Sequence, residues 1–181
     1  VFHATAALHR IAKASDHHEV KGDERLGSLA SKATDELVKW DKLKKPQTMS
    51  KIVWAMAKLE VKLQKLVSKV SEEALEKLPE FEPQQLVNMM WAYATMRSEE
   101  PTLRQLDALH GRLHSLAPLG QANLAWAVAK LMVRDWNTEE LVTECRMAVK
   151  EMNGQNLANT SWAFATLRIA DEDFFDAVVT Q

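Results

Sequence analysis

A nine-residue phrase occurs four times in this chain, and it constrains the fold more than any other feature. The copies occupy residues 51–59, 88–96, 123–131 and 159–167, each with a tryptophan at its fourth place. Successive tryptophans are 37, 35 and 36 residues apart. Self-similarity at a period between about 20 and 50 residues is typical of repeat proteins, in which each unit buries its apolar face against the next. The sequence therefore predicts one array of stacked units.

Each copy of the phrase has the composition of a buried helix. Counted from the tryptophan as position 0, positions +1 and +3 are Ala in all four copies, and position +5 is Leu or Met. These residues favour helix, and no Gly or Pro interrupts a copy. The apolar surface is wider than that of a helix covered on one side only. We interpret the tryptophans as core residues, because a base-stacking role would need exposed rings: Trp54, Trp91, Trp126 and Trp162.

The segments between the copies predict a second helix in each unit. We therefore expect an all-α fold, an α-solenoid of tandem helical hairpins with units of about 36 residues and a right-handed superhelix. A single array would span residues 1–181. Its units are a degenerate repeat 1–45, in which His9 takes the tryptophan place, repeats at about 46–82, 83–117 and 118–153, and an incomplete repeat 154–181.

Pro and Gly suggest where several helices begin and end. Pro46 can end the helix before it and open a tryptophan helix, because Pro is tolerated at the first helical position. The segment from Pro79 to Pro83 is expected to close the second helix of the Trp54 unit. Leucines spaced by three or four residues over 103–116 predict one second helix that ends before Pro118. Asn153-Gly154 is expected to end the following second helix in the left-handed conformation.

Composition excludes several classes of protein. Hydrophobic residues make up 46% of the chain and charged residues 27%, which suits a water-exposed surface around a sizeable core. Cys145 is the only cysteine, so no intramolecular disulfide can form, and no run of 18 apolar residues predicts a membrane span. The net charge of −2 is unlike that of a strongly basic nucleic-acid binder. The first residue is Val1, as expected of a fragment or a processed form, and no targeting peptide is visible.

Residues 83–96 read Pro-Gln-Gln-Leu-Val-Asn-Met-Met-Trp-Ala-Tyr-Ala-Thr-Met. This segment is similar to the Pro-x-x-Leu-x-Asn-x-x-Trp-Ala-x-Ala-x-Leu phrase of octotricopeptide repeats, helical hairpins of algal and protist organelle proteins that often accompany a RAP domain. The resemblance covers residues 46 to about 179, and more weakly 2–43. It implies an α-solenoid that binds single-stranded RNA in a chloroplast or mitochondrion and supports RNA maturation, stability, translation or ribosome assembly. The chain departs from the phrase at Lys51, Leu119-Gly120 and Thr160.

Polar residues recur at fixed places in the repeat. Positions −7, −3 and +4 fall on one helical stripe because seven residues are nearly two turns. Stacked units would align these residues, with those at −6, as a ladder of amides, hydroxyls and ammoniums that could contact base edges and phosphates. The candidate RNA-binding residues of this ladder are Gln47, Lys51, Lys58, Gln84, Gln85, Asn88, Thr95, Asn123, Lys130, Gln155, Asn156, Asn159 and Thr166. Leu119 is the exception at −7.

Each polar feature also has a structural interpretation. The amides at −3 could brace a turn or a neighbouring repeat's backbone, because buried polar groups are normally hydrogen-bonded. A second basic run could neutralise phosphates or could be a solvated helix face: Lys62, Lys65 and Lys69. The sequence leaves both choices open.

No pattern in the sequence predicts catalysis. His110 and His114 would share a helix face, but Gly111 and Arg112 stand where a zinc-protease helix needs a Glu. We therefore expect no enzyme, cofactor or metal site. Two functions remain: binding of single-stranded RNA, such as an organellar transcript or ribosomal RNA, or a scaffold or structural subunit of an organellar protein complex that uses the same surface.

Overall fold

The computed structural model describes residues 4–14, 16–39, 45–61, 63–98 and 102–180, and every regular element in these ranges is helical. The helices that carry the repeated phrase, with the first helix of the chain, are α1 (Ala4–Lys13), α3 (Pro46–Lys58), α5 (Pro83–Met96), α7 (Pro118–Lys130) and α9 (Gly154–Leu167). The helices that follow them are α2 (Glu24–Lys39), α4 (Gln64–Glu76), α6 (Thr102–Asp107), α8 (Glu139–Ala148) and α10 (Glu172–Val179). The prediction of an all-α protein is confirmed.

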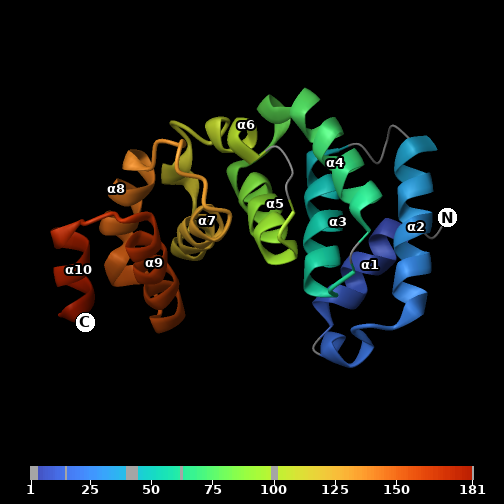
Figure 1. Cartoon of the computed structure of the whole chain (residues 1–181), viewed down its shortest axis with the longest axis horizontal. Coiled ribbons are helices and arrows are strands. Elements are labelled where there is room, and N and C mark those ends of the chain that lie inside the picture. Colours follow the sequence, from blue (N-terminus) through green and yellow to red (C-terminus); the bar gives the residue numbers. More distant parts are fainter. Residues whose placement is uncertain (1–3, 15, 40–44, 62, 99–101, 181) are drawn as a thin grey trace.

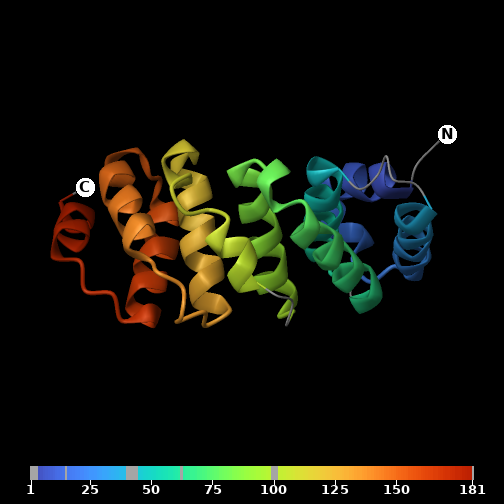
Figure 2. The ribbon, with the colours of Figure 1, turned by 90° about the horizontal axis from the view of Figure 1, so that it is seen from above.

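The helices lie in two rows. The inner row consists of α1, α3, α5, α7 and α9, and each of these helices packs against the next one in that order. The outer row consists of α2, α4, α6, α8 and α10, which curve around the inner row from one end of the molecule to the other (Figure 1). Viewed from above, the helices follow one another along a single elongated body whose termini lie at opposite ends (Figure 2). The first four inner helices each contact the outer helix that follows them.

The inner helices begin at equivalent places in the repeat. Pro occupies the first turn of α3, α5 and α7, eight residues before the tryptophan, and Gly154 opens α9 at the same place. Asn153 caps α9, because its side-chain oxygen accepts the Asn156 N–H at 2.9 Å. The prediction that Asn153-Gly154 ends the preceding helix is therefore wrong. The preceding helix, α8, is followed instead by a short 3-10 helix, η5 (Val149–Glu151), and the next residue, Met152, has an extended backbone.

The inner helices that carry the repeated phrase also end alike. Position +6 adopts the left-handed conformation in all four copies, with φ between 54° and 61°, although none of these residues is Gly: Glu60, Arg97, Met132 and Arg168. The N–H at +7 then donates to the carbonyl at +2 over 2.9 to 3.1 Å, which is the Schellman arrangement. The four helices therefore end with the same backbone conformation, and the chain leaves each of them toward the outer row in a similar direction.

We expect Met132→Gly to stabilise the protein by about 0.5–1 kcal/mol, because glycine adopts the left-handed conformation without the steric cost of a Cβ. Met132 is 47% exposed, so the lost side chain removes little burial. Urea denaturation of Met132→Gly and Met132→Ala separates the two effects. Equal stability of the two variants would contradict a backbone origin.

The outer row is less regular than the sequence predicts. The helix expected over residues 103–116 ends at Asp107, and the chain continues through a turn to a 3-10 segment, η4 (Leu113–Ser115). Gly111 lies in this turn with φ +73°, which an α-helix does not allow. His110 and His114 therefore do not share a helix face, and the expectation that they do is wrong.

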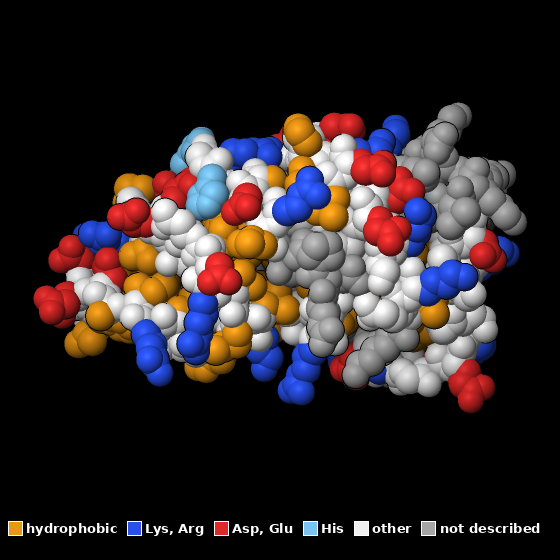
Figure 3. Space-filling model, turned by 45° about the horizontal axis from the view of Figure 1, so that its top comes forward, with side chains coloured by type: hydrophobic (Ala, Val, Ile, Leu, Met, Phe, Trp, Pro, Cys, Tyr) orange, Lys and Arg blue, Asp and Glu red, His pale blue; other side chains and the backbone are white. Residues whose placement is uncertain are grey.

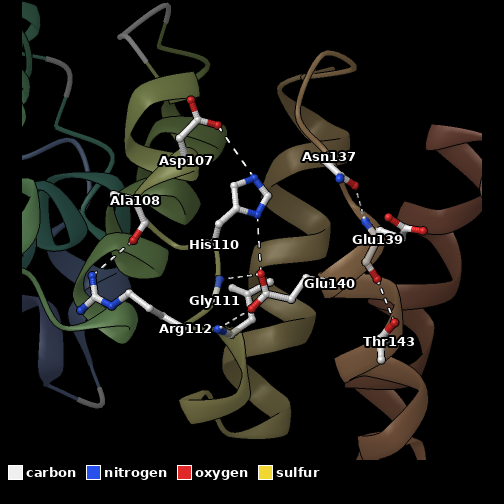
Figure 4. A network of polar contacts seen from close by, with 10 residues as sticks. Asp107, Ala108, His110, Gly111, Arg112, Asn137, Glu139, Glu140 and Thr143 are labelled. Carbon is white, nitrogen blue, oxygen red and sulfur yellow. Dashed lines mark hydrogen bonds and ion pairs between the residues drawn. The ribbon is translucent and has the colours of Figure 1, made fainter.

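Glu140 at the start of α8 holds this turn in place (Figure 4). Its carboxylate accepts the N–H of Gly111 at 2.8 Å and that of Leu113 at 3.1 Å. The His110 ring lies 3.5 Å from the same carboxylate and stacks on Trp136 with 5.2 Å between ring centroids. Partial burial acts to raise the pKa of Glu140, but the two N–H donors and His110 outweigh it and hold the pKa below the ordinary value of 4.5.

We expect Glu140→Gln to destabilise the protein by about 1 kcal/mol at neutral pH, since a solvent-screened, charge-assisted pair of hydrogen bonds is weakened. A carboxyl group with a lowered folded-state pKa stabilises fully above its unfolded pKa and loses this contribution as the pH falls through the folded-state value. The difference from wild type should therefore shrink below about pH 4.5. Urea midpoints across this range measure it. Equal midpoints of wild type and Glu140→Gln at neutral pH would contradict this role of the carboxylate.

Candidate nucleic-acid interface

Only a narrow stripe of each central inner helix reaches solvent. In α3, α5 and α7, every position from −5 to +3 is buried except −3 and the tryptophan at 0. Neighbouring inner helices cover two flanks and the outer helix covers a third. We call positions −7, −3, 0 and +4 of α3, α5, α7 and α9 the inner stripe. It is the part of these helices that neither the neighbouring inner helices nor the following outer helix covers.

The tryptophans lie on this stripe, which corrects their interpretation as core residues. Trp54, Trp91 and Trp126 pack against the core but are only half-buried, and Trp162 is 45% exposed. Trp162 is more open, and among the described residues α7 is the only inner helix that packs extensively against α9. The spacing carried this signal: position 0 lies three residues after −3 and four before +4, on the same helix face. The flanking apolar residues point elsewhere.

The structure brings most of the predicted ladder together along the stripe. The exposed members are Gln47, Lys51, Gln84, Thr95, Lys130 and Gln155. The half-buried members are Lys58, Asn88, Asn123, Asn159 and Thr166. Leu119, the apolar exception, is also exposed. Each inner helix from α3 to α9 therefore presents polar groups on both sides of a tryptophan.

Two units repeat the same hydrogen bonds on the stripe. The −7 Gln donates to the −3 Asn within its own helix, from Gln84 to Asn88 at 3.0 Å and from Gln155 to Asn159 at 2.9 Å. Thr95, like its counterpart at +4 in α9, donates to the carbonyl of its own tryptophan at 2.8 Å. Among the described contacts, no −3 Asn side chain bonds to a neighbouring unit's backbone. This pattern favours a surface ladder over an internal brace.

The departure at Leu119-Gly120 has a packing reason. Gly120 is buried, and a Cβ there would come within 2.7 Å of the Gln84 side-chain oxygen of the preceding inner helix. The side chain of Gln84 therefore lies against α7 while it bonds Asn88 on its own helix. Absence of a side chain at Gly120 lets one unit position a polar group of the unit before it.

Several predicted site residues do not belong to this surface. Asn156 is only 5% exposed, and Gln85 accepts the Glu82 N–H at 3.2 Å as part of the helix cap. Lys65 and Lys69 lie on α4 in the outer row, where Lys69 pairs with Glu73 at 3.3 Å. Lys62 lies outside the described residues. The ladder is therefore narrower than predicted.

The inner stripe is locally basic in a chain of net charge −2. None of its sixteen positions is Asp or Glu, and three are lysines: Lys51, Lys58 and Lys130. Helix α1 extends it, because His9 lies 5.8 Å from the Trp54 ring and Lys13 follows at +4. Partial burial and then the charges of Lys51 and Lys13 lower the pKa of His9. Figure 3 shows the molecule with the top of Figure 1 turned forward. On this face, unlike the inner stripe, acidic and basic side chains are mixed.

The described residues contain no cluster of three or more His, Cys, Asp or Glu side chains suited to a metal ion. None of the described helices combines the length and hydropathy needed to cross a bilayer. Cys145 is buried, which raises the pKa of its thiol to about 12. Neither the protein-family models nor the curated proteins include a match to this chain.

We expect Asn88→Ala to change the free energy of unfolding by less than about 0.5 kcal/mol, because among the described contacts its side chain bonds another surface side chain, that of Gln84. Gln121→Ala is the matched control. Gln121 is 3% exposed and donates to the Leu116 carbonyl at 3.3 Å, so its loss should cost about 1–3 kcal/mol. Chemical denaturation measures both. If Asn88→Ala costs as much as Gln121→Ala, the −3 Asn is a brace.

Proposed function

We propose that this chain is an α-solenoid of tandem helical hairpins with a unit of about 36 residues. Three facts support it: the inner helices begin at the same place relative to the tryptophan, they end in the same left-handed cap, and they pack in chain order. The inner stripe then repeats once per unit and forms a periodic surface.

We further propose that the inner stripe binds single-stranded RNA, and that the protein acts by binding and not by catalysis. The observation that carries this proposal is the composition of the stripe: amides, hydroxyls, lysines and half-exposed indoles in line, with no carboxylate among them. Side-chain amides can hydrogen-bond base edges, and ammonium groups can neutralise phosphates. The resemblance to octotricopeptide repeats points to an organellar transcript or ribosomal RNA in a chloroplast or mitochondrion.

The basic positions of the stripe test the proposal. Lys58→Glu combined with Lys130→Glu should weaken binding of a randomised single-stranded RNA pool by about tenfold or more, because phosphate contacts are replaced by repulsion. The slope of log affinity against log salt should fall by about 1.4, at 0.7 per lysine on a single strand. Fluorescence anisotropy at several salt concentrations measures both quantities.

Lys65→Glu combined with Lys150→Glu is the matched control. Both lysines are exposed, and they lie on α4 and η5, outside the inner stripe. This pair makes the same change in net charge and should leave affinity nearly unchanged. Equal losses in the two double variants would indicate attraction by overall charge and would contradict the stripe as the site.

A protein scaffold is the second candidate function, and one observation favours it. A shallow groove between α9 and α10 has a mainly apolar lining that includes Ala165, Ile169 and Phe175. Such a surface suits an apolar partner. A folded protein that binds no RNA at low salt would favour this second function.

A further inference from the structure

The partly exposed indoles on the inner stripe have no role in the polar ladder described above. They recur once per unit at the middle of the stripe, between an Asn or Lys at −3 and a Lys or Thr at +4. A side chain needed only for burial would lie fully inside, as Tyr93 and Phe164 do at position +2 of the same helices. The tryptophans instead keep part of their surface accessible on the face that carries the lysines.

The neighbours of each ring define what it can receive. Trp126 lies between Asn123 and Lys130 on α7, and Trp91 lies between Asn88 and Thr95 on α5. An aromatic surface beside an amide and a cation matches a nucleotide, which has an aromatic base with polar edges and a phosphate. An apolar peptide would fit the ring but would leave the amides and lysines without partners.

The series continues into the first helix of the inner row. His9 occupies the tryptophan place on α1, and its ring lies 5.8 Å from the Trp54 ring, tilted by 55°. At this end of the inner row, the rings at the tryptophan place of α1 and α3 therefore lie next to each other. Packed helices are about 8–10 Å apart, so a strand crossing the inner row would meet one ring per helix.

We propose that Trp54, Trp91, Trp126 and Trp162 are stacking platforms for successive bases of a single strand, one base per unit. This inference rests on the proposed RNA-binding function and specifies how that function is performed. Each indole stacks on a base, the amides at −7 and −3 contact the base edge, and the lysines contact the phosphates. Because every base has a π-face, the tryptophans supply affinity without sequence preference, and any preference comes from the amides.

The test compares a 12-nucleotide uridine RNA with an abasic RNA of the same length and charge. Both carry the same phosphates, but only the first can stack. We expect the uridine strand to bind about tenfold or more tightly, since loss of one stacked base lowers affinity by roughly this factor. The two strands should show similar salt dependence. This comparison uses the unmodified protein and does not depend on whether a variant folds.

Substitution at one platform assigns the effect to the stripe. Trp126→Leu should lower affinity for the uridine strand by about tenfold and leave affinity for the abasic strand unchanged, and Trp126→Phe should restore most of the loss. Trp162→Leu provides the same test at the most exposed ring, where folding is least affected. Circular dichroism checks that each variant remains helical.

The outcomes separate the two proposals. Equal binding of the uridine and abasic strands would overturn stacking and leave RNA binding through phosphates in place. A base-dependent affinity that Trp126→Leu and Trp162→Leu do not reduce would also overturn it, because the bases would then contact another surface. Failure of the folded protein to bind either strand would overturn the proposed function together with this inference.

Discussion

Close packing within the inner row is the constraint on which the rest of the structure depends. The alanines at +1 and +3 of α3, α5 and α7 are buried, with at most 2% exposed. Their small side chains allow neighbouring helices to approach, and protein interiors do not accommodate extra methylene groups without strain. Because both flanks and the back of each central inner helix are covered, only the inner stripe remains open. The surface available for function thus follows from how the interior is filled.

The two rows of helices differ in how regular they are. The outer row varies from unit to unit: α6 has 6 residues and α2 has 16, and Glu140 holds a turn where the sequence predicts a helix. The four inner helices that carry the repeated phrase have 13 or 14 residues, begin eight residues before the tryptophan and end in the same left-handed conformation. The proposed RNA ligand is itself periodic, so we propose the more regular inner row as the surface that binds it. Contacts between outer elements, such as those of Glu140, join neighbouring units, while the spacing of the inner helices stays regular.

Repeated signals located helices better than single signals did, although the repeated tryptophans were wrongly interpreted as core residues. Four copies of one phrase placed the starts of α3, α5, α7 and α9 and the ladder at −7, −3 and +4. Two predictions from single signals were wrong. Leucine spacing predicted a helix over 103–116, but the chain turns at Gly111. Asn153-Gly154 was predicted to end a helix, but it begins one. The first error arises because leucine spacing does not reveal a turn that is held by another element, here by Glu140. The second arises because Asn and Gly occur at either end of a helix, and contacts with other elements decide between the two.

By itself, the sequence determined that the protein is helical, where its tryptophan helices begin and which residues share a helical face, because these follow from periodicity along one chain. Only the tertiary structure decided how far each face is covered. It placed the tryptophans at the edge of the core, buried Asn156, moved Lys65 and Lys69 to the outer row and set Gln84 against Gly120. Exposure depends on which neighbours pack against a residue, and those neighbours come from distant parts of the chain.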